Sequence, residues 1–168
     1  MSVVIIGVDP GTRRMGVGVI RLTRCKPLVL DRLEFVLAET LVAKATDSPA
    51  ERLLTLHDDL VALCDELPAD GTTYLCGIEE GFGGGFATDL TLAEVRGVAR
   101  TVLARCFGPK SIRGYGNSTV KKVGAGHGGA TKKDVQLAVM RTLRMKACPQ
   151  VDAADALAVA ITRANDKE

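Results

Sequence analysis

A short apolar strand that ends in a carboxylate opens the chain and constrains its fold more than any other stretch. Residues 3–8, VVIIGV, form a largely β-branched run that is too short for a helix, and Asp9 follows it directly. Residues 9–12, DPGT, predict a turn, and residues 15–20 predict a second strand in which Gly16 and Gly18 allow another element to approach the backbone closely. Because α/β proteins place their chemistry at strand ends, Asp9 is a candidate functional residue, although Asp also commonly caps turns.

The composition predicts a single globular domain over residues 1–168, since 46% of the residues are hydrophobic and 25% are charged. No apolar run reaches the length of a membrane span, and we expect no export signal. The five cysteines are scattered and have no C-x-x-C spacing, which argues against a disulfide framework and against a zinc site. We therefore expect a reducing, cytoplasmic setting.

Acidic and basic residues are concentrated in different parts of the chain. Residues 31–70 hold ten acids and three bases, whereas residues 110–146 hold nine bases and one acid. This asymmetry is typical of a face that binds a polyanion, although a basic run is equally common on a solvated surface. Four lysines of the basic segment are candidate contacts to such a polyanion: Lys121, Lys122, Lys132 and Lys133.

Hydrophobic periodicity and turn residues predict alternating strands and helices, which is typical of an α/β fold. Beyond the first two strands, we expect strands at 27–38, 73–78 and 111–115, helices at about 49–66, 90–107, 117–123, 132–145 and 151–162, and loops at 39–47 and 124–129. Ser48 before Pro49, and Thr131 three residues before Asp134, predict capped helix starts. The loop GAGHGG at 124–129 lacks the G-K-[ST] ending of a phosphate-binding P-loop, so we exclude that motif.

Three further acids stand where a later strand ends and where the last helix begins. The apolar strand at 73–78 is followed by Glu79, which repeats the arrangement of the first strand and Asp9. Asp152 and Asp155 lie three residues apart, on one face of the first turn of a helix of small residues that is expected to pack on the same sheet. Acids also favour the positive end of a helix, so capping is an alternative role for this pair.

Together, the four carboxylates indicate a metal site. Acids that converge without matched bases repel one another unless cations lie between them. Oxygen ligands in this number favour Mg²⁺ or Mn²⁺, and two such ions about 3.5–4 Å apart clamp the attacking and leaving oxygens of a phosphodiester. With the basic segment as a phosphate-binding face, the pattern predicts a metal-dependent nuclease.

A glycine-rich loop at 81–86 carries Phe82 and Phe86 beside these acids. Exposed rings on such a loop stack on bases or wedge into an opened duplex. Rings that tuck back onto the core have a packing role instead, and the sequence leaves both roles open.

The chain resembles the Holliday junction resolvase family RuvC, which belongs to the ribonuclease H-like nuclease superfamily. The resemblance covers nearly the whole chain and is carried by GVDPGTRRMGVGVI near the start, IEEGF, VRGVA, the spacing from VK at 120–121 to Lys132 and VQ at 135–136, and, most specifically, QVDAADALAVAIT near the end. It implies a ribonuclease H-like fold, a mixed five-stranded sheet flanked by helices. The catalytic, metal-binding acids that it implies are Asp9, Glu79, Asp152 and Asp155.

The resemblance further implies a homodimeric endonuclease that resolves four-way DNA junctions by paired nicks. Two Mg²⁺ ions per site, which Mn²⁺ can replace, would activate a water and stabilise the departing 3′ oxygen, leaving 5′-phosphate and 3′-hydroxyl ends. Lys121 and Lys132 match the family's basic residues near the scissile phosphate, with Lys132 offsetting the developing charge, and Phe82 matches its aromatic residue at the crossover. The subunits would meet through the helix at 90–107, where Gly97 predicts close contact with the sheet or with a second subunit. A branch-migration helicase complex is a candidate partner.

The loop GGGFATDL departs from the family pattern because it is shorter and richer in glycine. Phe86 is therefore a second candidate for the role of Phe82. Glu80 adjoins Glu79, and the IE pattern favours Glu79 as the metal ligand.

Three alternative functions remain at this point. An actin-like ATPase or sugar kinase also opens with a strand, an Asp and Gly-Thr, but it needs two lobes, for which the chain is too short. A non-catalytic junction-binding protein would lack metal-dependent nicking. Another ribonuclease H-like nuclease would prefer RNA–DNA hybrids or other branched DNA, and a comparison of substrates separates it from a junction resolvase.

Overall fold

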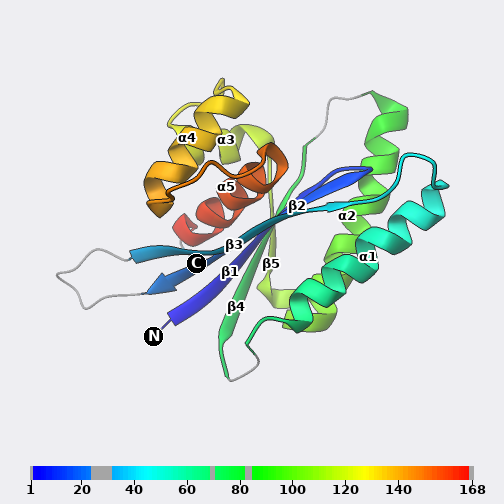
Figure 1. The fold of residues 1–168 in the computed structure, drawn as a ribbon, viewed down its shortest axis with the longest axis horizontal. Helices are drawn as coiled ribbons and strands as arrows, with labels where there is room; N and C mark the ends of the chain where they lie inside the picture. The colour runs from blue at the N-terminus through cyan, green and yellow to red at the C-terminus, as the bar shows by residue number, and fades with distance from the viewer. Residues whose placement is uncertain (1, 24–31, 69–70, 82–84, 167–168) are drawn as a thin grey trace.

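Five strands form one mixed sheet at the centre of the molecule (Figure 1). The computed structural model describes residues 2–23, 32–68, 71–81 and 85–166. The strands are β1 (Ser2–Pro10), β2 (Arg14–Thr23), β3 (Arg32–Val42), β4 (Thr73–Glu79) and β5 (Ile112–Tyr115). Their order is β3-β2-β1-β4-β5, with β1 antiparallel to β2 and parallel to β4. The predicted mixed five-stranded sheet is confirmed.

Helices cover both faces of this sheet (Figure 1). The helices are α1 (Pro49–Asp65), α2 (Phe86–Phe107), α3 (Asn117–Ala125), α4 (Lys132–Leu143) and α5 (Val151–Asn165). α1 and α2 pack on one face, and α3, α4 and α5 pack on the other. Among the helices that the structure describes, none is both long enough and apolar enough to cross a membrane.

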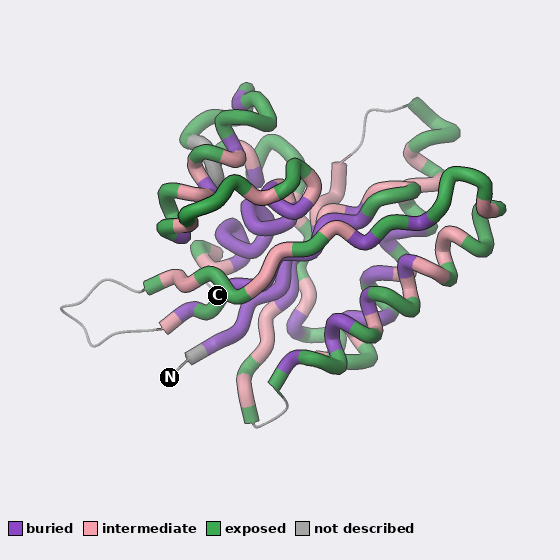
Figure 2. Tube along the Cα trace, viewed as in Figure 1, coloured by how far each residue is buried: buried purple, intermediate pink, exposed green. Residues whose placement is uncertain are grey.

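β1 is buried on both faces, which explains its nearly unbroken apolar sequence. Val4, Ile6 and Val8 belong to the core under α1 and α2, whereas Val3 and Ile5 belong to the core under α3, α4 and α5. A strand covered on both faces needs apolar residues at every position rather than at alternate ones. Figure 2 shows the buried class running through β1 and most of α5.

Glycines in β1 and β2 let the last helix lie directly on the sheet. A Cβ atom at Gly7 would lie 2.1 Å from the backbone oxygen of Ala156, and a Cβ atom at Gly18 would lie 2.6 Å from the backbone nitrogen of Leu157. Gly7 and Gly18 are direct partners across the β1–β2 pair, so together they open one shallow channel for the helix. The predicted close approach to Gly16 and Gly18 is confirmed, and the approaching element is α5.

Both predicted helix caps are present. Ser48 and Glu51 form a capping box at the start of α1, and Thr131 and Asp134 form one at the start of α4. In each box a hydroxyl and a carboxylate accept hydrogen bonds from backbone N–H groups that a helix start otherwise leaves unpaired.

The third strand lies later in the chain than predicted. The sequence indicates a strand at 27–38 and a loop at 39–47, whereas β3 spans Arg32–Val42, and residues 27–31 of that prediction lie outside the described ranges. β3 pairs with β2 as far as Val42 opposite Arg14. Because β3 is an edge strand, its polar residues remain in contact with water, and tertiary pairing overrides their local preference for a loop.

Other bounds differ by a few residues. α2 begins at Phe86 instead of residue 90, and α3 extends to Ala125, into the loop predicted at 124–129. α4 ends at Leu143, before the predicted end at about 145, and α5 continues to Asn165. Helix ends depend on caps and tertiary contacts that hydrophobic periodicity does not encode.

Candidate active site

The parallel pairing of β1 with β4 brings two acids together. Val8 is paired with Ile78, so Asp9 and Glu79, the next residue of each strand, stand side by side at the carboxyl ends of neighbouring strands. Asp155 of α5 joins them, and the three acids line one hollow of about 150 Å³. The hydrogen bonds between β1 and β4 fix the backbone from which these two carboxylates project.

α5 delivers the fourth acid because its first turn lies over Gly16. A Cβ atom at Gly16 would lie 2.0 Å from the backbone oxygen of Asp152, and Gly16 is paired with Asp9 across β1 and β2. The cap of α5 is Gln150, so Asp152 and Asp155 lie inside the helix and do not form the capping box considered for them. Three of the four predicted acids thus line the hollow, and Asp152 lies outside its lining but near enough for its charge to act on Asp9.

Burial and mutual repulsion disfavour the charged forms of these acids. Burial, followed by the charges of Glu79 and Asp155, raises the pKa of Asp9 from its ordinary 3.8 to about 8. Burial, followed by the charge of Asp155, raises the pKa of Glu79. Burial also raises the pKa of Asp155, against the lowering effect of Lys132. Carboxylates with raised pKa values are typical of functional sites. A positive charge placed among them would stabilise their ionised forms and lower these pKa values.

Donor groups hold the outer oxygens of three of the acids. The pairs are Lys132 Nζ with Asp155 Oδ2 at 3.2 Å, Asn117 Nδ2 with Glu79 Oε1 at 3.0 Å, and Arg14 Nε with Asp152 Oδ2 at 2.6 Å. Within the described ranges, no three acidic, histidine or cysteine side chains are already arranged to hold a metal ion. Lys132 and Arg14 bring positive charge to these oxygens and Asn117 is a neutral donor, so a cation that binds the same oxygens would have to displace these groups.

The raised pKa of Asp9 predicts a loss of stability with rising pH when divalent cations are absent. The folded-state pKa of about 8 lies above the ordinary 3.8, so between these values the folded state retains a proton that the unfolded state has released. Stability is therefore lost as the pH rises from about 4 to about 8. Because Asn removes a buried charge and its repulsion with Glu79 and Asp155, we expect metal-free Asp9→Asn to melt above the unsubstituted protein at pH 8 and to approach it near pH 4. The melting temperature should rise by about 2–4 °C for each kcal/mol of stability gained. Thermal denaturation in EDTA measures this, and an equal difference at both pH values would contradict it.

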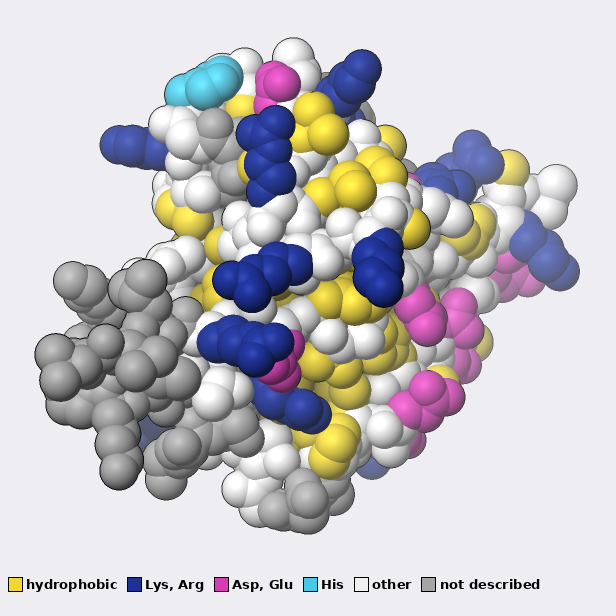
Figure 3. Space-filling view, turned by 60° about the vertical axis from the view of Figure 1, so that its left-hand side comes forward, with side chains coloured by type: hydrophobic (Ala, Val, Ile, Leu, Met, Phe, Trp, Pro, Cys, Tyr) yellow, Lys and Arg dark blue, Asp and Glu magenta, His cyan; other side chains and the backbone are white. Residues whose placement is uncertain are grey.

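Two of the four candidate lysines lie at the acids. Lys121 and Lys132 line the same hollow as Asp9. Lys122 and Lys133 are exposed on α3 and α4, outside the lining of that hollow. On the face drawn in Figure 3, Lys and Arg side chains are spread widely, whereas Asp and Glu gather mainly toward the right-hand edge.

The residues at the end of β4 and in the segment that follows it have different surroundings. Glu79 lines the hollow, whereas Glu80 forms an ion pair with Arg100 of α2. Phe86 is 82% exposed at the start of α2, so it does not tuck back onto the core. Phe82 lies outside the described residues.

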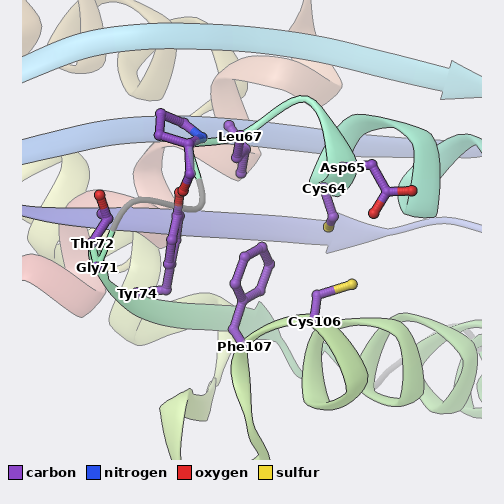
Figure 4. A pocket seen from close by; sticks show the side chains of 9 residues that line it. Cys64, Asp65, Leu67, Gly71, Thr72, Tyr74, Cys106 and Phe107 are labelled. Atoms are coloured by element: carbon purple, nitrogen blue, oxygen red, sulfur yellow. The ribbon is translucent and has the colours of Figure 1, made fainter.

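A larger cavity lies at the opposite end of β4 and is separate from the acids. It measures about 450 Å³ and lies between the carboxyl-terminal ends of α1 and α2 (Figure 4). Tyr74, near the start of β4, stacks there on Phe107 with ring centroids 4.5 Å apart. Asp65 is the one acid among its described lining residues, so this cavity lacks a carboxylate cluster.

Comparison with known proteins identifies the family. The sequence model described as crossover junction endodeoxyribonuclease RuvC matches residues 5–163. This chain belongs to the RuvC family. The RuvC of Roseiflexus sp. (strain RS-1) is 42% identical over 159 residues, covering 93% of this chain and 87% of that protein. The RuvC of Prochlorococcus marinus subsp. pastoris is 33% identical over 164 residues, covering 97% of each.

Solved RuvC structures share the fold. The structure of Thermus thermophilus RuvC in complex with Holliday junction substrate has a TM-score of 0.79 and 26% identity, covering 96% of this chain and 93% of that chain. A second structure of Thermus thermophilus RuvC has a TM-score of 0.76 and 24% identity, and the match covers 96% of this chain and 92% of that chain. The fold class that the resemblance implied is confirmed.

Sequence reasoning missed three residues that support the acids in this RuvC-family chain. Arg14 and Asn117 hydrogen-bond to acids that lie far from them in the sequence. Arg14 lies in the GVDPGTRRMGVGVI segment that carries the family resemblance, whereas none of the segments that carry it includes Asn117. Arg96 of α2 donates a hydrogen bond at 2.8 Å to the carbonyl oxygen of Gly81, two residues after Glu79. Arg96 lies in the VRGVA segment, so a signal for this residue was present in the sequence.

Proposed function

We propose that this chain is a structure-selective endonuclease that resolves four-way DNA junctions by paired, metal-dependent nicks, leaving 5′-phosphate and 3′-hydroxyl ends. The convergence of four acids from β1, β4 and α5 beside two lysines carries the proposal. Membership of the RuvC family supports the junction as substrate, because the Thermus thermophilus relative was solved with a Holliday junction. The basic segment supplies the positive surface that DNA backbones require.

The donor set fits hard divalent cations. Asp9, Glu79, Asp152 and Asp155 would hold two Mg²⁺ ions, or Mn²⁺ in their place, because all four offer carboxylate oxygens. The raised pKa of Asp9, which burial and then the charges of Glu79 and Asp155 cause, supports this fit, because a bound cation would offset both effects. The charged donors on Asp152 and Asp155 support it too, because they show that these carboxylates attract positive groups. When bound, such ions would activate a water for in-line attack and stabilise the leaving 3′ oxygen.

Lys132 would stabilise charge that develops on the scissile phosphate. Burial lowers its pKa, but the charge of Asp155 and a hydrogen bond to it outweigh this effect, so the pKa of Lys132 is raised and the side chain stays charged. Its side chain is 65% exposed, which leaves it free to turn from Asp155 to a phosphate at the mouth of the hollow.

The remaining DNA contacts lie around this centre. Lys121 would contact phosphates next to the scissile one, and the exposed Lys122 and Lys133 would contact phosphates farther along the arms. The exposed ring of Phe86 would stack on a base at the opened crossover, and we assign the same role to Phe82.

The active form would be a homodimer joined through α2. Leu90 on this helix is 53% exposed, and a Cβ atom at Gly97 would meet no described atom within 4 Å. Gly97 is exposed and therefore does not contact the sheet, and we propose that the close contact predicted there is made with a second subunit. Two sites related by a two-fold axis would nick opposing strands of one junction.

Leu90→Glu is expected to weaken the dimer about tenfold or more, because it removes a buried leucine from the interface and introduces a charge there. Leu54→Glu is the matched control, since Leu54 is 60% exposed on α1, outside the proposed interface. Sedimentation equilibrium measures both dissociation constants. A dimer of unchanged strength in Leu90→Glu would place the interface elsewhere.

A labelled synthetic four-way junction tests the function. With Mg²⁺ we expect symmetric nicks in opposing strands, and DNA ligase should reseal the ends if they carry 5′-phosphate and 3′-hydroxyl groups. An RNA–DNA hybrid of matched sequence and the same reactions in EDTA serve as controls. Cleavage of the hybrid in preference to the junction would assign the chain to the other nuclease class, and binding without cleavage in Mg²⁺ and Mn²⁺ would make it a binding protein.

A further inference from the structure

Arg14 makes a contact with the acids that the proposed chemistry does not use. Its Nε donates to Oδ2 of Asp152 at 2.6 Å, and its Nη2 donates to Oε1 of Gln150 at 3.3 Å. These partners stand 138 and 136 residues later in the chain, at the start of α5. One guanidinium therefore links the first residue of β2 to the N-cap residue of α5 and to Asp152 in its first turn.

The strand that carries Arg14 also supports the backbone of Asp152. Gly16, two residues later, leaves the space in which the carbonyl of Asp152 lies, 2.0 Å from where a Cβ atom would be. Arg14 itself is paired with Val42 of β3, so its backbone is held by the sheet. The backbone of Arg14 is thus fixed by strand pairing, so its guanidinium reaches Asp152 from a strand and not from a loop.

Arg14 differs in position from the lysines that serve the hollow. Lys121 and Lys132 line the space around Asp9, whereas Arg14 is not part of that lining. The side chain of Arg14 is 51% exposed and that of Asp152 is 25% exposed. Arg14 consequently holds Asp152 from the outer rim of the site.

A guanidinium and a divalent cation compete for one carboxylate, because both need its oxygens and they repel each other. We propose that Arg14 is a built-in counter-ion for Asp152 that a divalent cation must displace, and that it thereby sets the cation concentration at which the site fills. This inference rests on the proposed function, in which Asp152 is a metal ligand.

The test is direct titration with Mn²⁺, followed by electron paramagnetic resonance of the free ion, without DNA. Arg14→Gln is expected to bind Mn²⁺ roughly two- to fivefold more tightly than the unsubstituted protein, the range that corresponds to a partly exposed ion pair. Arg13→Gln is the matched control, since it removes the same charge one residue earlier and Arg13 is also exposed. An affinity in Arg14→Gln that equals or falls below that of Arg13→Gln would overturn the proposal.

Two further variants separate the inference from its premise. In an Asp152→Asn background, Arg14→Gln is expected to leave Mn²⁺ affinity unchanged, because the competed carboxylate is gone. Arg14→Lys, which keeps the charge without the forked donor, is expected to give an intermediate affinity and serves if Arg14→Gln does not fold. If the unsubstituted protein binds Mn²⁺ and cuts junctions while all Arg14 variants bind equally, only this inference fails. If the unsubstituted protein binds no Mn²⁺, the proposed metal chemistry fails and this inference fails with it.

Discussion

Asp9→Asn is expected to slow junction cleavage by roughly 10²–10³-fold or more, the loss typical of removing one directly stabilising group. Asn preserves the size of the side chain but removes the negative charge that would hold a cation between β1, β4 and α5. The lysines around the site are untouched, so junction affinity is expected to stay within about twofold of the unsubstituted protein. Single-turnover cleavage and a gel-shift assay measure the two effects separately.

Asp59→Asn is the matched control for Asp9→Asn, since Asp59 is exposed on α1 and the same charge is removed away from the hollow. Unfolding would not explain the lost cleavage, because Asp9→Asn is expected to raise the melting temperature of the metal-free protein at pH 8. A variant that cuts at the unsubstituted rate would remove Asp9 from the catalytic site.

The acids were predictable because the fold joins them through regular elements. Asp9 and Glu79 each follow a short apolar run, and parallel pairing of two such strands places the next residues together. α5 was predictable as their neighbour because its small residues complement glycines in the strands. Both sequence patterns can be recognised within short segments, and the geometry of the sheet then brings the acids of these segments close together.

The parts that sequence reasoning missed depend on contacts between distant segments. β3 reaches Val42 because β2 offers it a partner along its full length, although the local sequence at 39–42 favours a loop. Arg14 and Asn117 meet their acids only after the sheet and α5 are assembled. Hydrophobic periodicity carries no signal for such pairs, so Arg14 and Asn117 were missed, whereas the acids and the donor Lys132 were predicted.

Gly16→Ala is expected to destabilise the protein by about 2–4 kcal/mol and to abolish most junction cleavage. The new Cβ atom would lie 2.0 Å from the backbone oxygen and 2.6 Å from the backbone carbon of Asp152, and neither atom can rotate away as a side chain can. The start of α5 must therefore move off the sheet, and it carries Asp152 and Asp155 with it. Loss of glycine flexibility in the unfolded chain stabilises by only about 0.4–1 kcal/mol, which is too little to offset the clash.

Gly116→Ala separates this clash from a general effect of replacing glycine. Gly116 has a φ of −67°, which Ala adopts freely, and its Cβ atom would meet no described atom within 4 Å. Because Gly116 is the N-cap residue of α3, where Ala is less favourable than Gly, we expect this control to lose at most about 1 kcal/mol, well below the loss in Gly16→Ala. Urea denaturation measures both variants, and cleavage is assayed at a temperature where Gly16→Ala remains folded. Gly16→Ala could instead match Gly116→Ala in stability and still cut junctions. The close contact between α5 and β2 would then not be needed to position Asp152 and Asp155.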